Sequence, residues 1–270
     1  MTVFLPRRAV LAFTGAGRVS FLQGLVTNDL QTLTQDQAVW SALLTPQGRW
    51  LSEFFLFAQG DHILMDCAAE HADFLAKKLS RFRLRSDVQI NRTDLHVVVG
   101  SGTEDLPADA VTAAADPRCE GAGWRAIVSA LPEHSASERD YLERRLALGL
   151  PDNEDFVSEQ TLALEANMDL LNGVSWKKGC YMGQELTART HYRGLLKKRM
   201  LPVTLMGASF PESGGIVMME DREVGEIRSR SGNLAIAVLR REAWSSSALT
   251  CNGHSLSINW PLWFPVEMRS

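Results

Sequence analysis

A cysteine in the C-terminal half of the chain has neighbours that could make it reactive. Cys180 lies between Gly179 and Gly183, and Lys177 and Lys178 precede it. Positive neighbours favour a thiolate over a thiol, and glycines let a ligand or another stretch of backbone come close. The pattern predicts a nucleophilic, oxidisable thiol, with a buried structural thiol as the alternative.

Polar side chains that could hold a heterocycle follow this cysteine. Gln184 offers a hydrogen-bond donor and an acceptor, and Glu185 offers two acceptor oxygens. Between Trp176 and Met200 there are seven basic residues and one acidic residue, although the whole chain has a net charge of −4. This asymmetry predicts a local site for an anion. The alternative is a solvated, lysine-rich strand edge.

Composition limits the class of protein. The chain has 270 residues, of which 45% are hydrophobic and 22% charged, as expected of a soluble globular protein with two domains, or with one large domain and an appendage. No apolar run approaches the ~18 residues of a membrane-spanning helix. The pair Arg7-Arg8 precedes a short apolar run, which we interpret as a buried strand rather than an export signal. The four cysteines are far apart and form no CxxC pair, which predicts reduced thiols and a cytoplasmic protein.

The sequence lacks the common motifs of nucleotide-binding, serine-hydrolase and metal sites. The run Gly15-Ala16-Gly17-Arg18-Val19-Ser20 lacks the third glycine of a dinucleotide-binding turn. The sequence contains neither a P-loop nor a GxSxG elbow. Its histidines never form HxxxH or adjoin a cysteine pair, so we expect no metal site built from this chain alone.

The first half of the chain predicts strands and two helices. We expect strands over 3–13, 38–44, 50–57 and 63–67, with a turn at 45–48 joining the second and third, and helices over 19–26 and 71–79. Residues 81–85 alternate arginine with apolar residues. As a strand, this run would place three arginines on one face, either solvated or functional.

In the second half, the pattern of apolar and turn residues changes near residue 200. We expect a strand over 95–99, an acidic loop over 101–115, and a helix over 138–148 that Gly149 and Pro151 end. From Leu201 onward, short apolar runs alternate with Gly, Asn and Ser turns. This pattern predicts a small antiparallel barrel or sandwich of about 70 residues.

The most specific motif occupies residues 178–189, the signature segment, which reads K-G-C-Y-M-G-Q-E-L-T-A-R. It closely resembles the signature of the YgfZ family, the folate-binding relatives of the glycine-cleavage T-protein (aminomethyltransferase). The blocks F-L-Q-G-L-V-T-N-D at 21–29, L-T-P-Q-G-R at 44–49 and L-R-S-D-V at 84–88 resemble further parts of that family. The resemblance covers residues 9 to 242.

The resemblance implies an α+β fold with a GcvT-like arrangement of three lobes around a central folate pocket and a small C-terminal antiparallel β-barrel. Residues 1–199 would form the folate-binding region. Within it, 1–45 and 140–199 would build one lobe and 46–139 an inserted second lobe. Residues 200–270 would form the barrel.

The resemblance also implies a function. The protein is expected to bind tetrahydrofolate, or a one-carbon derivative of it, and to support assembly or repair of iron–sulfur cluster enzymes, with Cys180 as the reactive residue. Its expected partners are folate and iron–sulfur proteins or their assembly factors, with no membrane. The expected folate contacts are Asn28, Asp29, Arg49, Asn167, Lys178, Tyr181, Gln184, Glu185 and Arg189.

One departure from the T-protein leaves alternatives open. Where the T-protein carries a pair of aspartates after its glycine turn, this chain carries Ser52-Glu53, which makes glycine-cleavage activity doubtful. One alternative is a folate-dependent aminomethyl- or methyltransferase that uses Glu53 as its acid or base. The other is an RNA-binding module, for tRNA for instance, that uses the basic segment 176–200 with aromatic residues such as Trp176.

Overall fold

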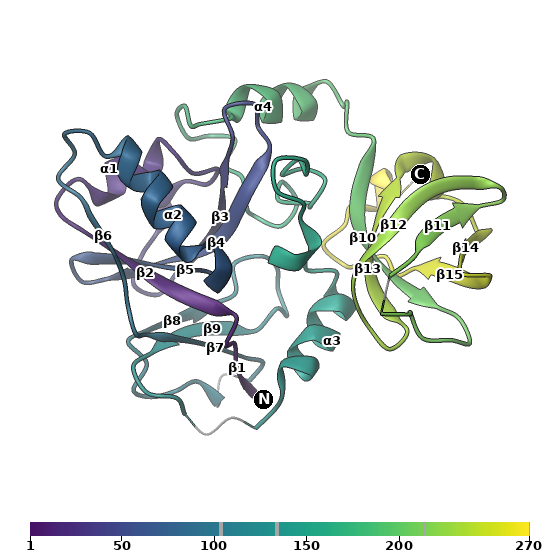
Figure 1. Cartoon of the computed structure of the whole chain (residues 1–270), viewed down its shortest axis with the longest axis horizontal. Coiled ribbons are helices and arrows are strands. Elements are labelled where there is room, and N and C mark those ends of the chain that lie inside the picture. Colours follow the sequence, from purple (N-terminus) through teal and green to yellow (C-terminus); the bar gives the residue numbers. More distant parts are fainter. Residues whose placement is uncertain (103–104, 133–134, 213, 270) are drawn as a thin grey trace.

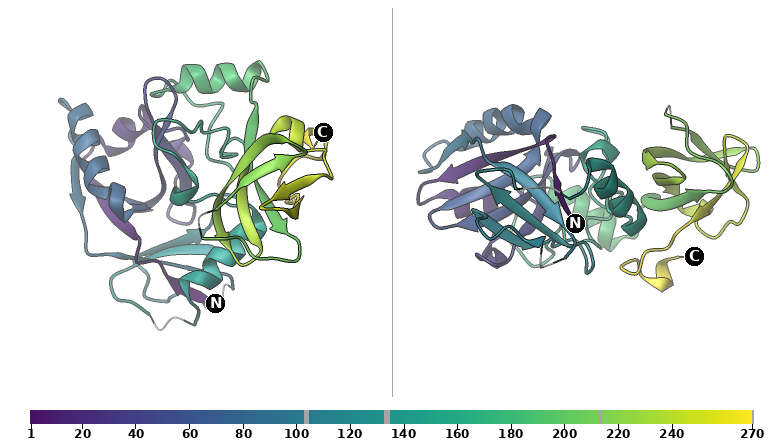
Figure 2. Two further views of the ribbon diagram at one scale, coloured as in Figure 1. Left: turned by 45° about the vertical axis from the view of Figure 1, so that its right-hand side comes forward. Right: turned by 90° about the horizontal axis from the view of Figure 1, so that it is seen from below.

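The computed structural model describes residues 1–102, 105–132, 135–212 and 214–269. Two β-sheets with their helices lie at one side of the molecule, and a β-barrel lies at the other (Figure 1). The view from below shows the same separation (Figure 2). The chain between helices α3 and α4 runs through the middle of the molecule, between the sheets and the barrel (Figure 1).

The first sheet has five antiparallel strands in the order β3-β4-β5-β2-β6. These strands are β2 (Arg8–Thr14), β3 (Val39–Leu44), β4 (Trp50–Gln59), β5 (His62–Ala68) and β6 (Gln89–Arg92). The long apolar runs of β3 and β4 are buried on both faces. The sheet therefore forms the rigid centre of the N-terminal half.

Two helices accompany this sheet, with a short 3₁₀ turn η1 (Leu30–Thr32) after the first. They are α1 (Arg18–Gln23) and α2 (Ala69–Phe82). Helix α2 buries Ala72, Leu75 and Leu79, which recur at helical spacing. Its outer face stays in solvent.

The second sheet has four strands in the order β1-β7-β9-β8. They are β1 (Thr2–Phe4), β7 (His96–Gly100), β8 (Thr112–Ala115) and β9 (Trp124–Val128). Helix α3 (Glu138–Leu148) follows, with Ser137 and Asp140 forming a capping box and Gly149 ending the helix in the left-handed conformation at φ 71°. The helix predicted over 138–148 is confirmed, because both of its ends are set by local residues.

The C-terminal part is a closed barrel in the order β10-β13-β12-β11-β14-β15. Its strands are β10 (Lys198–Leu205), β11 (Ile216–Met219), β12 (Arg222–Ser231), β13 (Leu234–Arg240), β14 (Leu249–Cys251) and β15 (His254–Ile258). Closure leaves no free edge among these strands. The predicted barrel is confirmed.

The remaining helical elements are short. They are η3 (Asn153–Asp155), α4 (Gln184–Tyr192), η4 (Arg241–Ala243) and η5 (Val266–Met268). None of the helices in the described ranges is both long and apolar enough to cross a membrane. All four cysteines are free; Cys67 and Cys251 are buried, and Cys180 is exposed.

Three expectations from the sequence are wrong. The strand expected over 3–13 is two strands, β1 and β2, which lie in different sheets because the chain turns at residues 5–7, where Pro6 lacks a backbone N–H. Residues 81–85 form no strand: α2 continues to Phe82, and the exposed residues after it form a turn. The loop expected over 101–115 contains strand β8 at its end. The predicted division of residues 1–199 into lobes stays a prediction, although the β3–β4 hairpin spans the boundary expected at residues 45 and 46.

Candidate functional site

Lys178 anchors the signature segment from inside. Its ammonium donates hydrogen bonds to the carbonyl oxygens of Gln23, Val26 and Asn28, each at 2.7 Å. Burial lowers the pKa of Lys178 to about 8, and nearby Asp29 opposes that shift. All three donors of the ammonium are used by the backbone around the end of α1. Lys178 therefore holds the segment in place and has no donor left for a ligand.

Two glycines let the signature segment pack on the β3–β4 turn. Gly183 has φ +83°, and a Cβ atom there would lie 2.5 Å from the carbonyl oxygen of Thr45. A Cβ atom on Gly48 would lie 3.0 Å from the carbonyl oxygen of Gly183. The two backbones touch directly, so two segments singled out in the sequence for the same resemblance are also neighbours in space.

Cys180 lies on the exposed side of this anchored loop. Nearby, the Trp176 ring stacks on His191 with centroids 4.0 Å apart, and Tyr192 meets both rings edge-on. Tyr181 points inward, and burial raises its pKa to about 12. The segment thus presents one thiol to solvent from a backbone that is fixed on both sides.

Three of the predicted folate contacts, Asn28, Asp29 and Asn167, make hydrogen bonds within the protein. The Asn28 amide donates to the carbonyl oxygens of Trp40 and Asn172, and the Asp29 carboxylate accepts from the Gln31 amide at the start of η1. Asn167 is buried at φ 58° and donates to the carbonyl oxygen of Met200.

The other predicted contacts, Arg49 and three residues of α4, are exposed or half-buried. Arg49 donates to the carbonyl oxygen of Gln160. Glu185 and Arg189 are exposed on α4, and Gln184 is half-buried at its start. The predicted residues therefore divide between internal hydrogen bonds and the surface, and they do not converge on one pocket.

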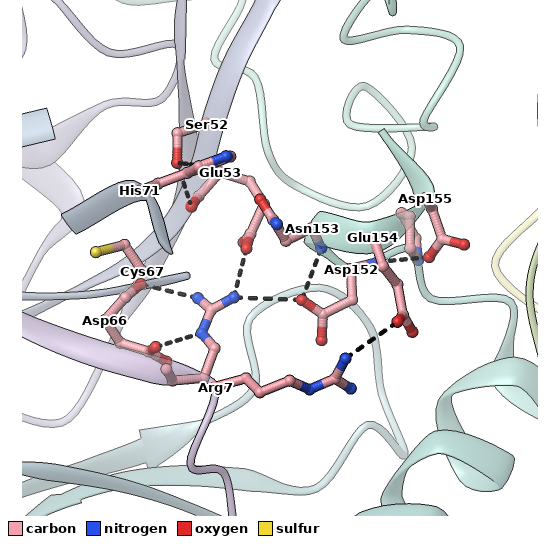
Figure 3. A network of polar contacts seen from close by, with 12 residues as sticks. Arg7, Ser52, Glu53, Asp66, Cys67, His71, Asp152, Asn153, Glu154 and Asp155 are labelled. Atoms are coloured by element: carbon pink, nitrogen blue, oxygen red, sulfur yellow. Dashed lines mark hydrogen bonds and ion pairs between the residues drawn. The ribbon is translucent and has the colours of Figure 1, made fainter. Parts of the chain in front are cut away.

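Charged side chains converge instead between the two sheets. We call Arg8, Glu53, Asp66, Arg125 and Asp152 the arginine network. Arg8 reaches Glu53 at 2.5 Å, Asp66 at 2.6 Å and Asp152 at 3.2 Å, and Arg125 reaches Asp66 at 2.6 Å. Figure 3 shows the carboxylates of Glu53, Asp66 and Asp152 pointing toward a common centre. Each carboxylate faces a guanidinium, which compensates the cost of burying both charges.

An aromatic ring supports the arginines of this region. The guanidinium carbons of Arg125, Arg118 and Arg8 lie 3.9, 5.0 and 5.7 Å from the centre of the Phe55 ring. Arg118 is itself paired with Asp116 at 2.6 Å. Stacking of cations on the ring adds to the ion pairs and keeps the guanidinium planes fixed.

Asp152 and Arg8 are the members of the arginine network that border a cavity. Burial alone would raise the pKa of the Asp152 carboxyl, but Arg8 and Arg145 outweigh burial and hold that pKa well below its usual range. The Tyr141 hydroxyl donates to the same carboxylate at 3.4 Å. Asp152 is therefore an ionised acceptor at the cavity wall.

The cavity has a volume of about 360 Å³. Its wall includes Arg7, Glu70, Tyr141, Asp152 and Asn153. The Asn153 side-chain oxygen is buried and has no hydrogen-bond partner among the described residues. A free acceptor beside an ionised carboxylate suits a ligand edge rich in N–H groups, such as the edge of a pterin ring. These residues therefore fit a folate head group, although none of them was predicted as a contact.

Glu53 and Ser52, which replace the pair of aspartates of the T-protein, are both buried. The Glu53 side chain is buried, and its second oxygen accepts from the Trp40 indole at 2.9 Å. Ser52 is also buried, with its hydroxyl 3.1 Å from Nδ1 of His71, and burial lowers the pKa of that imidazole. The role of Glu53 as an acid or base stays a prediction; in the structure both of its oxygens are engaged.

Sequence reasoning missed Arg8, Asp66, Arg125 and Asp152. Their signal was present, because Asp66 and Arg125 are single charged residues within otherwise apolar strands. A lone charge in a buried strand requires a partner. The partners are up to 144 residues apart in the chain, so the pattern could not name them.

Comparison with a solved structure defines the fold class. The chain superimposes on the crystal structure of glycine cleavage system aminomethyltransferase T from Bartonella henselae with a TM-score of 0.74, covering 97% of this chain and 86% of the other at 13% identity. The α+β fold is therefore GcvT-like with a C-terminal barrel, as expected. Residues 197–266 match the model of the CAF17 C-terminal β-barrel domain.

The relatives narrow the class to one family. The iron–sulfur cluster assembly factors IBA57 of Mus musculus and Homo sapiens are each 31% identical to this chain, over 88% of it and 77% of the relative. The IBA57 homolog of Mycosarcoma maydis is 35% identical over 78% of this chain, which spans 59% of that relative. The chain belongs to the IBA57 family. The YgfZ family, identified from the signature segment, is related to it but distinct.

One expectation is overturned by these relatives. The sequence predicted a cytoplasmic protein from its unpaired cysteines, whereas the names of these IBA57 relatives describe them as mitochondrial. Reduced thiols are compatible with more than one compartment, so cysteine usage could not distinguish between them.

Proposed function

We propose that this protein supports the assembly or repair of iron–sulfur clusters through the thiol of Cys180. The observation that carries the proposal is an exposed thiol on a segment held rigidly by Lys178 and Gly183. Thiolates are the usual protein ligands of iron–sulfur clusters, and a fixed, accessible thiol can meet a cluster on another protein. The IBA57 relatives, whose names describe iron–sulfur cluster assembly factors, support the same role.

Substitution of the thiol tests this role. Cys180→Ala is expected to leave folding and solubility unchanged, since the side chain makes no buried contact that anchors the loop, and to abolish recovery of an iron–sulfur enzyme in cells that lack the native protein. Cys119→Ala, at a half-buried thiol, is the matched control and should retain function. Full recovery with Cys180→Ala would contradict the proposal. Insolubility of that variant would make the cysteine structural.

We further propose that tetrahydrofolate, or a one-carbon derivative, binds in the cavity beside Asp152. Asp152 and the unpaired oxygen of Asn153 would accept hydrogen bonds from the N–H groups of the pterin edge, and Tyr141 would contact its ring. Arg7, exposed at the cavity, would meet the carboxylates of the glutamate tail. When bound, the folate supplies a carrier for one-carbon units.

Titration with tetrahydrofolate tests this site, with tryptophan emission as the readout. Asn153→Ala is expected to weaken binding by about tenfold, because it removes an acceptor while keeping the backbone of η3. Asn91→Ala, at an exposed position on β6, should bind as the wild type does. Equal affinities for the wild type and Asn153→Ala would place the folate elsewhere, and no saturable binding would remove folate from the proposal. The transferase and RNA-binding alternatives stay predictions.

A further inference from the structure

The outer face of α2 and the loop that follows it are unusually basic and apolar for an acidic protein. From residue 74 to 86 the chain has five basic residues and no acidic one. We call this region the α2 surface, and its members are Phe74, Lys77, Lys78, Arg81, Phe82, Arg83, Leu84 and Arg85. All of them are exposed except Lys78, which is partly buried with its ammonium 5.6 Å from the centre of the Phe74 ring.

Leu84 is the most unusual member of the α2 surface. Its residue is 90% exposed, and its backbone has φ 44°, in the left-handed region that a branched apolar residue rarely adopts. Such a conformation persists only where the surroundings impose it. The loop displays an apolar side chain to solvent, at a cost in both hydration and backbone strain, and this suggests a role outside the folded core.

Hydrogen bonds hold this loop rigidly. The Arg83 guanidinium donates to the carbonyl oxygen of Val88, and the Ser86 amide donates to the carbonyl oxygen of Arg83. Asp87 ties the loop to the turn before α1, since its carbonyl oxygen accepts from the Gly17 amide at 3.0 Å. A Cβ atom on Gly15 would lie 2.3 Å from that carbonyl oxygen, so the turn and the loop are in direct contact.

The arrangement of charged and apolar side chains on the α2 surface favours a lipid surface over a protein partner. Phe74, Lys77, Lys78 and Arg81 share one helix face at spacings of three and four residues, so cations separate the apolar side chains in space. A protein interface gathers its apolar residues in a core depleted of charge. The headgroup region of a bilayer instead accepts interleaved basic and apolar side chains, with the apolar ones reaching the acyl boundary.

We infer that the α2 surface binds the surface of an anionic phospholipid membrane, with Leu84 and Phe82 entering the headgroup region and the five cations facing lipid phosphates. This is peripheral binding, on an element that spans nothing, and it departs from the absence of a membrane partner expected from the sequence. It is independent of the proposed roles of Cys180 and the cavity, because none of the α2 surface residues belongs to either.

Sedimentation with vesicles tests the inference on the full chain. The protein should bind vesicles of phosphatidylcholine mixed with phosphatidylglycerol, ignore pure phosphatidylcholine, and lose binding as salt rises. The double variant Arg81→Glu/Arg85→Glu should bind at least about tenfold more weakly, since each lost cation costs roughly fivefold. The matched control is Arg240→Glu/Arg241→Glu, which makes the same charge change on exposed residues of the barrel.

The apolar contribution has its own pair of variants. Leu84→Ser should weaken binding to the anionic vesicles several-fold, whereas Leu262→Ser, at a fully exposed leucine near the barrel, should not. The inference is overturned if the wild type ignores anionic vesicles, or if the barrel controls lose binding as much as the α2 variants do. Retention on polyglutamate without binding to vesicles would overturn it in favour of an acidic protein partner.

Discussion

The arginine network and the signature segment both use buried cations, and they use them in opposite ways. In the arginine network, each guanidinium faces carboxylates from other elements, and the charges tie two sheets and η3 together. In the signature segment, the Lys178 ammonium faces three backbone carbonyl oxygens, of Gln23 at the end of α1 and of Val26 and Asn28 just after it, and no carboxylate of the described residues forms an ion pair with it. The first arrangement joins distant parts of the chain, whereas the second shapes one loop so that a neighbouring thiol stays outside.

The sharpest test of this contrast is Asp66→Asn in the arginine network. Asp66 receives both Arg8 and Arg125 and is completely buried, so the neutral amide leaves two guanidinium groups undercompensated. We expect a loss of about 3–5 kcal/mol in the free energy of unfolding, measured by urea denaturation. Arg139→Gln, which breaks an exposed ion pair with Glu143, should leave the urea midpoint unchanged. Similar midpoints for both variants would mean that the arginine network contributes little to folding.

A smaller loss is expected when the signature segment loses its anchor. Lys178→Met keeps the length of the buried side chain and removes all three donors, leaving carbonyl oxygens without partners. We expect about 3 kcal/mol of destabilisation in the same urea measurement. Lys177→Met is the matched control, because Lys177 is the exposed neighbour. Equal stability of the two variants would show that the ammonium is not the anchor.

The smallest effect is expected at the glycine contact. Gly183→Ala places a methyl group against the Thr45 carbonyl oxygen in a left-handed backbone, which we expect to cost about 1–3 kcal/mol. The displaced loop should also change the rate at which Cys180 reacts with a thiol reagent. Gly179→Ala meets nothing within 4 Å and should alter neither quantity. A labelling rate that does not change in Gly183→Ala would show that the reactivity of Cys180 does not depend on the packing of this loop.

Local patterns were sufficient for the elements whose ends are set by neighbouring residues. The α3 helix has its capping box and its terminal glycine within the same short stretch, and the turn at 45–48 carries its own Pro and Gly. The barrel could also be predicted, because short apolar strands alternate there with segments that contain Gly, Asn and Ser. The run at 81–85 was misassigned because two periodicities fit a five-residue segment equally well, and only the preceding turns of α2 decide between them.

The candidate site also has one part that local sequence predicts and one part that depends on tertiary packing. The sequence alone predicted Cys180 and its segment, since the motif is contiguous and its residue types suggest its chemistry; the role of Cys180 stays a prediction. Only the tertiary structure showed that the Lys178 ammonium donates all of its hydrogen bonds to backbone carbonyl oxygens. It also showed that Asn28 and Asn167 form hydrogen bonds within the protein. It alone brought Arg8, Asp66, Arg125 and Asp152 together, with Arg8 and Asp152 in the wall of one cavity. Ion pairs between strands depend on which strands become neighbours, and that is decided by the burial of whole sheets rather than by the spacing of any residues along the chain.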